Sequence, residues 1–419
     1  MQDVARVDRC SSAPDRALLS LQGKGVGYSM HPSPTDAVLM ERLVRLCLRS
    51  RWDVGARASV AAMMGAGEVN WTAVVAWARE SRVTPLLYDA LRGQDAVPPD
   101  VLGSLRAGYD RTFRYNLYLF GELQKVLRRL NAAAVPVIIL KGAALAQVVY
   151  GNLALRPLRD LDLLVPQDAV PRVERIVKEL GYGVPRVEAQ PGAALAFESQ
   201  LKVIKFEPLF AQIEIHWSLI DSPFYQNKLA SEWFWETAVA LAVRSESARM
   251  LGPEAQILYL CAHLLLHHGG ANLLWLNDVA EVIRWYGAVV DWEELVKQAQ
   301  ALRLTLPAQM ILTQVAEEWG APLPAEVVVK LRELPVTSAE SRVARALTTL
   351  GRSPIQRLWD DLWSLPSWKD RLRFAWINLF PSRDYMRQRY GAGNPFLVAL
   401  AYPYRWWLGV QTFGTRFRK

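Results

Sequence analysis

The feature that most constrains this chain is a pair of aspartates inside an apolar strand. Residues 140–165 read LKGAALAQVVYGNLALRPLRDLDLLV and place Asp160 and Asp162 in the second of two apolar runs. Side chains alternate between the two faces of a strand, so both carboxylates are expected to share one face with Leu158 and Leu164. An unpaired buried charge is costly. We therefore expect either protein cations or metal ions beside the two aspartates.

A second polar strand face supplies a third carboxylate. Residues 212–218 read QIEIHWS, which places Gln212, Glu214 and His216 on one face and apolar side chains on the other. If this strand lies beside the aspartate strand, three carboxylates converge and repel one another. Hard oxygen ligands of this kind favour Mg²⁺ or Mn²⁺ over zinc. His216 could orient Glu214 or contact a substrate, and a structural hydrogen bond is the alternative.

Lys141 and Gly142 stand at the junction between the first strand and a short helix. Glycine permits close backbone approach, and the free N–H groups at the start of this helix can hold a phosphate. Lys141 adds a positive charge, and Arg156 could make a bidentate contact with a phosphate. In the competing interpretation Lys141 is a solvated strand end, and Arg156 and Arg159 neutralise the aspartates.

The periodicity of the sequence changes twice along the chain. Helical patterns precede residue 133, strands and helices alternate over 135–218, and helical patterns return from about Asp221. We expect an α+β fold, in which a small mixed sheet is flanked by N-terminal and C-terminal helical regions. The expected parts are a disordered leader (1–35), a helical region (36–112), an α/β core (113–220), a helical domain (221–365) and a basic aromatic helical tail (366–419).

Composition and charge narrow the class of protein. Half of the residues are hydrophobic, which argues against overall disorder, and the three cysteines are too scattered for a disulfide framework, so we expect a cytoplasmic protein. The net charge of +8 is concentrated at the C-terminus, because residues Lys369–Lys419 include ten Lys or Arg but only two Asp. Either a last helix packs its aromatic side chains on the body, or residues 396–419 make peripheral contact with a membrane.

The order of these motifs resembles the bacterial uncharacterised nucleotidyltransferases, a branch of the polymerase-β-like superfamily. An apolar strand, Lys-Gly, a short helix, Tyr-Gly, RPLRDLDLLV and IEIHW follow one another, and the flanking stretches WTAVVAWARESRVTPLLYDAL and FPSRDYMRQRYG also look like the family. The resemblance covers most of the chain from about Val38. In it, Lys141-Gly142 stands where the superfamily has a Gly-Ser turn, Asp160 and Asp162 match its Asp-x-Asp pair, and Glu214 matches its third carboxylate.

The resemblance implies a metal-dependent nucleotidyltransferase. Asp160 and Asp162 would bind Mg²⁺ or Mn²⁺ bridging a nucleoside triphosphate, with ATP the expected nucleotide. Glu214 would hold a second metal and help to deprotonate a hydroxyl of the acceptor, and pyrophosphate would leave. Because the turn lacks the superfamily serine, phosphate binding would depend on the backbone, Lys141 or Arg156.

Other interpretations stay open at this point. The sheet could bind nucleotide and metal without turnover, as a scaffold that engages a partner enzyme or a membrane surface. We do not expect nucleic acid, because the basic tail is far in sequence from the carboxylates. The spacing of His263 and His267 would suit zinc, with Asp278 as a candidate third ligand, but a polar helix face is the favoured interpretation. The sequence does not determine the acceptor, the base of the nucleotide or the oligomeric state. The acceptor could be a sugar, another small molecule, a peptide or a protein.

Overall fold

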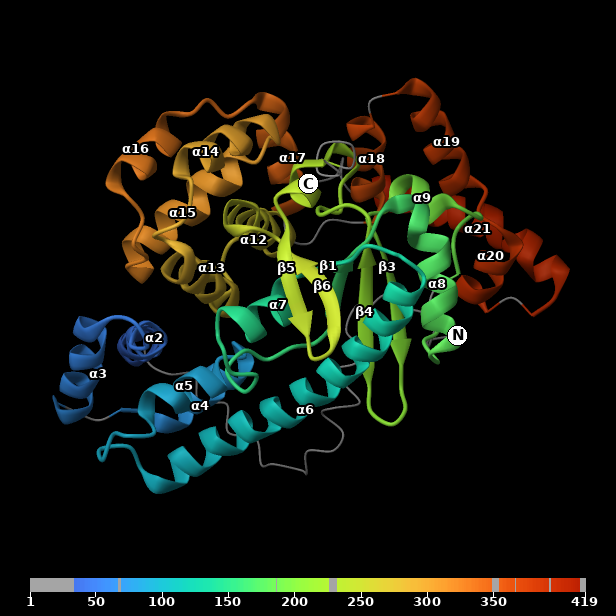
Figure 1. Cartoon of the computed structure of the whole chain (residues 1–419). Helices are drawn as coiled ribbons and strands as arrows, with labels where there is room; N and C mark the ends of the chain where they lie inside the picture. The colour runs from blue at the N-terminus through green and yellow to red at the C-terminus, as the bar shows by residue number, and fades with distance from the viewer. Residues whose placement is uncertain are drawn as a thin grey trace.

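The computed structural model describes residues 34–66, 69–185, 187–225, 232–348, 354–365, 367–391 and 393–414. Nearly all of the leader predicted at 1–35, and residues 415–419 of the tail, lie outside these residues. The chain has the α+β fold that the sequence predicted, with a small mixed sheet flanked by helices (Figure 1). The boundaries of the five expected parts remain predictions.

Five helices precede the sheet in the part of the chain that the structure describes. They are α2 (Pro34–Arg49), α3 (Val54–Ala66), α4 (Trp71–Glu80), α5 (Thr84–Leu91) and α6 (Pro99–Ala132). The long helix α6 buries apolar side chains at positions three or four residues apart, among them Leu119, Leu123, Val126 and Leu130, because such positions share one helix face. It runs from the N-terminal helices to the sheet (Figure 1).

Six strands form one sheet in the order β3-β4-β2-β1-β6-β5. The strands are β1 (Ile138–Leu140), β2 (Leu161–Leu164), β3 (Gln200–Lys205), β4 (Ala211–His216), β5 (Val239–Val243) and β6 (Glu246–Met250). β2 runs parallel to β4 and β1 runs parallel to β6, while the other neighbours are antiparallel. The segments between them carry α7 (Lys141–Val148), the 3-10 helix η2 (Gln167–Ala169), α8 (Val170–Glu179), α9 (Ala193–Phe197) and α11 (Glu232–Glu236).

The hairpin of β5 and β6 corrects the expectation that only helices follow Asp221. Its turn consists of Arg244 and Ser245, and Arg244 has a φ of 53°. Two-residue turns of this kind are normally marked by Asn-Gly or Asp-Gly, since left-handed φ angles favour those residues. The turn of this hairpin carries no such signal, and the two strands were therefore missed.

Ten helices in the described C-terminal residues complete the fold. They are α12 (Pro253–His268), α13 (Leu273–Tyr286), α14 (Trp292–Ala301), α15 (Thr305–Trp319), α16 (Ala325–Glu333), α17 (Ser338–Thr348), α18 (Pro354–Ser364), α19 (Trp368–Leu379), α20 (Arg383–Tyr390) and α21 (Pro395–Gly414). None of the described helices combines the length and the apolar character needed to cross a membrane.

The sheet separates two hydrophobic cores. On one face, side chains such as Leu161 and Ile213 pack with α6 and α8. On the other face, Leu140 and Leu164 pack with α7 and α12, and this core continues through α13 and α15 into the N-terminal helices. The second core therefore joins the helical regions that precede and follow the sheet.

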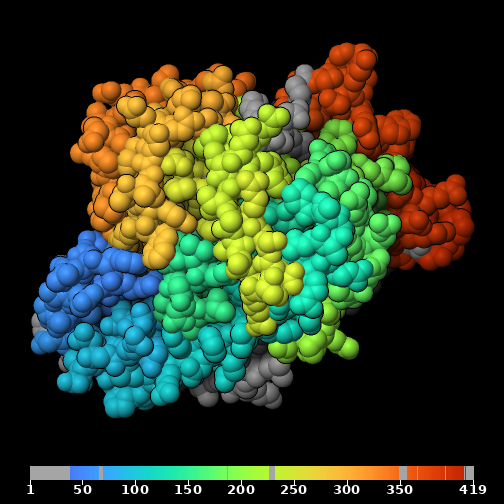
Figure 2. All heavy atoms as spheres, in the orientation of Figure 1, coloured from blue at the N-terminus to red at the C-terminus, as the bar shows by residue number. Residues whose placement is uncertain are grey.

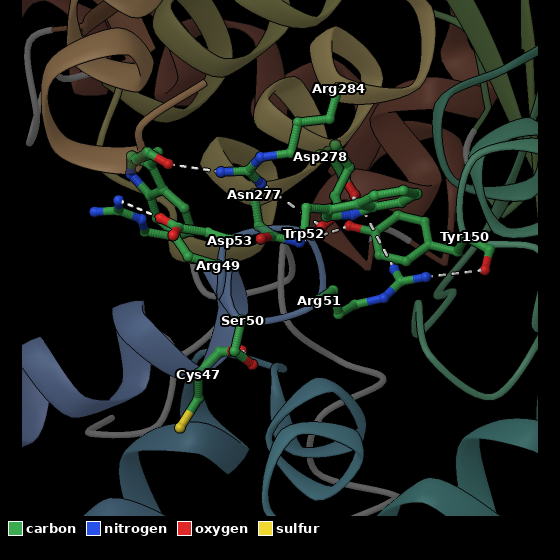
Figure 3. A network of polar contacts seen from close by, with 12 residues as sticks. Cys47, Arg49, Ser50, Arg51, Trp52, Asp53, Tyr150, Asn277, Asp278 and Arg284 are labelled. Atoms are coloured by element: carbon green, nitrogen blue, oxygen red, sulfur yellow. Dashed lines mark hydrogen bonds and ion pairs between the residues drawn. The ribbon is translucent and has the colours of Figure 1, made fainter. Parts of the chain in front are cut away.

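A buried polar network reinforces this joint at the end of α2 (Figure 3). The Oε2 atom of Glu281, on α13, accepts hydrogen bonds from Trp52 Nε1 at 2.6 Å and from Arg51 Nη1 at 3.3 Å. Arg51 also donates to the backbone oxygen of Tyr150, which follows α7. Burial raises the pKa of Glu281, and the positive charge of Arg51 opposes that rise. The network thus connects α2, α7 and α13 through one carboxylate that has no contact with water.

The Glu281→Ala variant is expected to lose about 3 kcal/mol of unfolding free energy, because it leaves Arg51 and Trp52 without their buried acceptor. Urea unfolding followed by circular dichroism measures the loss. Glu333→Ala, which removes an exposed glutamate at the end of α16, is the control and should change the free energy by less than about 0.5 kcal/mol. Equal effects of the two substitutions would contradict the role given to the network.

Candidate functional site

The pairing of β2 with β4 brings the predicted polar residues together. In this parallel pair Asp162 lies opposite Glu214, and Leu164 lies opposite His216. Strand alternation then directs Asp162, Glu214 and His216 to one face of the sheet, while Leu163 and Ile215 enter the core on the other face. The two sequence patterns predicted this shared face for Asp162, Glu214 and His216.

Asp160 reaches the site from outside the strand. β2 begins at Leu161, so the alternation predicted from residue 158 does not extend that far. Leu158 correspondingly lies in the α6 core rather than on the carboxylate face, and its N–H donates to Asn116 Oδ1 at 3.2 Å. Burial together with the nearby charges of Asp162 and Glu214 raises the pKa of Asp160 to about 7.

Asp162 contacts a lysine and a histidine of the site through one oxygen. Its Oδ1 atom lies 2.9 Å from Nε2 of His216 and 3.1 Å from Nζ of Lys141. Burial alone would raise the pKa of Asp162, but the charge of Lys141 and the hydrogen bond with His216 lower it well below its usual range. Asp162 is therefore held as a carboxylate despite being almost fully buried.

Glu214 completes a set of three groups that could hold a metal ion. One ligand atom from each of Asp162, Glu214 and His216 lies within 4.8 Å of the others. Glu214 also accepts a hydrogen bond from Gln212 Nε2 at 3.0 Å and pairs with Lys202 Nζ at 3.3 Å. Two carboxylate oxygens and an imidazole nitrogen in such proximity are a chemically suitable donor set for a divalent cation.

Lys141 is an internal cation rather than a solvated strand end. It opens α7 with a φ of 45°, and its Nζ atom lies 5.6 Å from the ring centroid of Tyr259 on α12. Burial by itself would lower the pKa of Lys141, but the carboxylates of Asp162 and Glu214 outweigh this and raise it. Lys141 is thus charged and directed at the carboxylates.

Gly142 makes room for Arg156. A Cβ atom at this position would lie 2.3 Å from Arg156 Nη1 and 2.8 Å from Leu158 Cδ2. The guanidinium of Arg156 is turned toward α13, where its Nη2 donates to Asp278 Oδ2 at 2.7 Å and its Nε lies 3.3 Å from the same oxygen. The structure therefore pairs Arg156 with Asp278 rather than with the aspartates of the Asp-x-Asp pair.

The histidines of α12 do not assemble with Asp278. The Nε2 atoms of His263 and His268 lie 3.2 Å apart, and Nε2 of His267 accepts from the N–H of Asp221 at 3.4 Å. Burial lowers the pKa of all three histidines, which favours their neutral forms. Among the residues that the structure describes, no group of three potential metal ligands contains these histidines.

Arg82 is a candidate residue that sequence reasoning missed. It lies between α4 and α5, and its guanidinium carbon lies 5.3 Å from the ring centroid of Trp275 on α13. Burial and the neighbouring cations Arg159 and Arg156 lower the pKa of Arg82 to about 10. The only signal in the sequence was its place in the family-like stretch RESRVTPLLYDAL, because its proximity to Asp160 depends on how the helices pack.

Comparisons with known proteins identify the family to which the chain belongs. A family model described as uncharacterised nucleotidyltransferase matches residues 67–320, well over half of the chain, and the chain belongs to this family. Among solved structures, the chain is similar to an antigenic nucleotidyltransferase-like protein from Paracoccidioides brasiliensis, with 15% identity and a TM-score of 0.33. That match covers 50% of this chain and 95% of the other. Among curated proteins none matches the sequence.

The Gly142→Ala variant is expected to lose about 1–3 kcal/mol of unfolding free energy, because the new methyl group overlaps Arg156 and Leu158. Gly103→Ala makes the same chemical change in α6, where the added Cβ meets nothing, and should stabilise by about 0.5–1 kcal/mol. Thermal and urea unfolding of both variants measure whether each substitution lowers or raises the unfolding free energy. A stabilising effect at Gly142 would show that Arg156 does not need the space.

Proposed function

We propose that this protein transfers a nucleoside monophosphate from a nucleoside triphosphate, with ATP the expected donor, to a hydroxyl of an acceptor and releases pyrophosphate. The observation that carries the proposal is the convergence of Asp162, Glu214 and His216 on one buried sheet face, with Asp160 beside them. Membership of the nucleotidyltransferase family supports the same reaction class.

The residues of the site fit a divalent metal. Asp162 and Glu214 supply carboxylate oxygens, Asp160 adds a third carboxylate nearby, and His216 supplies a nitrogen. Carboxylates suit both Mg²⁺ and Mn²⁺. The imidazole favours Mn²⁺ over Mg²⁺, because nitrogen ligands favour transition metals. When bound, such an ion would neutralise charge on the reacting phosphate oxygens. Glu214 would additionally accept the proton of the acceptor hydroxyl at its carboxylate, as the sequence suggested.

The cations of the site are proposed to bind the triphosphate. Lys141 already stands at the carboxylates, where it can turn from Asp162 toward a phosphate oxygen. Arg82 is the second candidate, since it is half-buried beside Trp275 and the positive charges of Arg159 and Arg156 act on it more strongly than the negative charges of Asp160 and Asp278. An anion placed there would relieve this concentration of positive charge. Arg156 is proposed to position Gly142 and α13 through Asp278, rather than to touch the nucleotide.

A non-catalytic scaffold is the second candidate, and two contacts favour it. Lys141 Nζ and His216 Nε2 both lie on Asp162 Oδ1, so protein groups already occupy one of the two oxygens that Asp162 offers to a metal. Calorimetry with ATP and Mg²⁺ or Mn²⁺, run beside a pyrophosphate-release assay, separates the two functions. Binding with release supports the enzyme, and binding without release supports the scaffold.

The Asp162→Asn variant is expected to reduce transfer from labelled triphosphate by about a hundredfold or more, because the amide cannot replace the charge of a metal-binding carboxylate. The assay is run with Mg²⁺ and with Mn²⁺, and circular dichroism checks the fold. Asp168→Asn, the same change at an exposed aspartate just after β2, is the matched control and should retain full activity. Undiminished transfer in Asp162→Asn would overturn the assignment.

The Arg82→Ala variant is expected to raise KM for the triphosphate on the order of tenfold with a smaller change in kcat, because it removes charge that binds the donor. The KM of Arg82→Lys should lie between those of the unaltered protein and Arg82→Ala, since lysine keeps the charge but lacks the planar guanidinium. Arg79→Ala, which removes an exposed arginine from α4, should leave both constants unchanged. An unchanged KM in Arg82→Ala would exclude this residue from the donor site.

A further inference from the structure

The C-terminal helices carry an unusual concentration of exposed aromatic side chains. Helices α18–α21 form a lobe at the edge of the molecule, drawn in red in Figure 2. A small core of its own holds part of this lobe together. Its exposed large apolar side chains are Trp359, Trp363, Trp368, Leu372, Trp376, Leu379, Phe396, Leu397, Leu400, Tyr404, Trp406 and Trp407.

Helix α19 has two apolar faces, and only one of them is covered. Phe374 and Ile377 are buried against the rest of the protein, and Phe374 meets the ring of Phe197 in α9 at 5.2 Å. Trp368, Leu372 and Trp376 recur every four residues on another side and are 66%, 61% and 62% exposed. The helix is therefore already docked, and its second apolar face remains open.

The exposed faces of α19 and α21 are continuous. The ring of Trp376 lies 4.4 Å from that of Phe380, and Phe380 lies 5.5 Å from Trp406. Trp406 also donates from Nε1 to the backbone oxygen of Leu379 at 2.9 Å. We call the exposed faces of α19 and α21, joined at Phe380, the C-terminal aromatic surface. Contiguous exposed apolar surfaces of this kind mark interaction sites.

The lobe is held firmly against the core of the molecule. Gln190 Nε2 donates to the backbone oxygen of Phe380, and the N–H of Ser382 donates to the oxygen of Ala189, each at 2.5 Å. The N–H of Val187 donates to Gln388 Oε1 at 2.9 Å. These contacts fix the loop ahead of α9 to α20, so the aromatic surface is presented by a docked element.

Basic side chains accompany the aromatic ones. Lys369 is exposed next to Trp368 on α19, and Arg373 is also exposed, with its guanidinium carbon 5.7 Å from the ring centroid of Phe197. Exposed arginines also line α20, which connects α19 with α21. Across Lys369–Lys419 the sequence has ten Lys or Arg against two Asp. The charge complementary to this surface is therefore negative.

We propose that the C-terminal aromatic surface docks on a lipid bilayer that contains anionic headgroups. Tryptophan and tyrosine combine an apolar ring with a polar group, which suits the boundary between headgroups and acyl chains. Lysine and arginine beside them attract anionic lipids, and the two effects together give stable surface binding. Membrane contact was one of two alternatives for residues 396–419, and the inference extends it to α19. It does not depend on the proposed transferase activity.

The test is co-sedimentation of the full chain with phosphatidylcholine vesicles, with and without phosphatidylglycerol. We expect binding to the vesicles that contain phosphatidylglycerol, weakening as salt is raised. The double variant Trp368→Glu and Trp376→Glu should reduce the partition coefficient on the order of tenfold or more. Trp285→Glu on α13, which replaces a comparably exposed tryptophan outside the surface, is the matched control and should bind like the unaltered chain.

Three outcomes would overturn the proposal. They are no binding to either kind of vesicle, undiminished binding of the double variant, and a change from dimer to monomer in light scattering as the sole effect of that variant. The last would assign the surface to a second copy of the chain. Circular dichroism checks folding, and Leu372→Glu is a milder substitution should the double variant misfold. Transfer from labelled triphosphate, measured without vesicles, should be unaffected by either variant.

Discussion

The buried ion pair between Arg156 and Asp278 is the contact on which the arrangement of the site depends. Arg156 lies just before β2 and packs directly over Gly142 at the start of α7, while Asp278 belongs to α13. Tyr150, after α7, donates to Asp278 Oδ1 at 2.8 Å and accepts from Asn277 at 2.9 Å. One carboxylate therefore positions the start of α7, its end and the approach to β2. A buried pair of this kind is costly to break, because either partner would remain as an uncompensated charge.

The neighbouring site balances negative charge in a different way. Asp160, Asp162 and Glu214 crowd one end of the sheet, and Lys141 and Lys202 supply the positive charge that the chain itself provides. Burial acts to raise the pKa of both aspartates. The pKa of Asp160 is raised, whereas that of Asp162 is lowered because Lys141 contacts it directly. Protein cations thus neutralise part of the buried negative charge that the sequence predicted. A divalent ion would neutralise the rest, as proposed.

Local sequence patterns predicted much of this geometry. The alternation in QIEIHWS placed Glu214 and His216 on one strand face, and the structure has them there. The alternation around DLDLLV held for Asp162 and Leu164, but failed at Leu158, because the strand begins only at Leu161 and the preceding chain follows Asn116 of α6. The hairpin of β5 and β6 was missed for a related reason. Its turn, Arg244 and Ser245, makes side-chain hydrogen bonds with Gln124 of α6 and carries no glycine or asparagine.

By itself, the sequence determined the fold class, the helical flanks and the identity of the three strand-borne polar residues, because periodicity and short motifs are local properties of the chain. Only the tertiary structure decided which partners those residues meet. Arg156 and Asp278 are 122 positions apart, and Arg82 meets Trp275 from a different helical region. Such long-range pairs depend on how helices dock, which no local pattern encodes. The open face of α19 belongs to the same category, since an amphipathic pattern predicts an apolar face but not whether the rest of the molecule covers it.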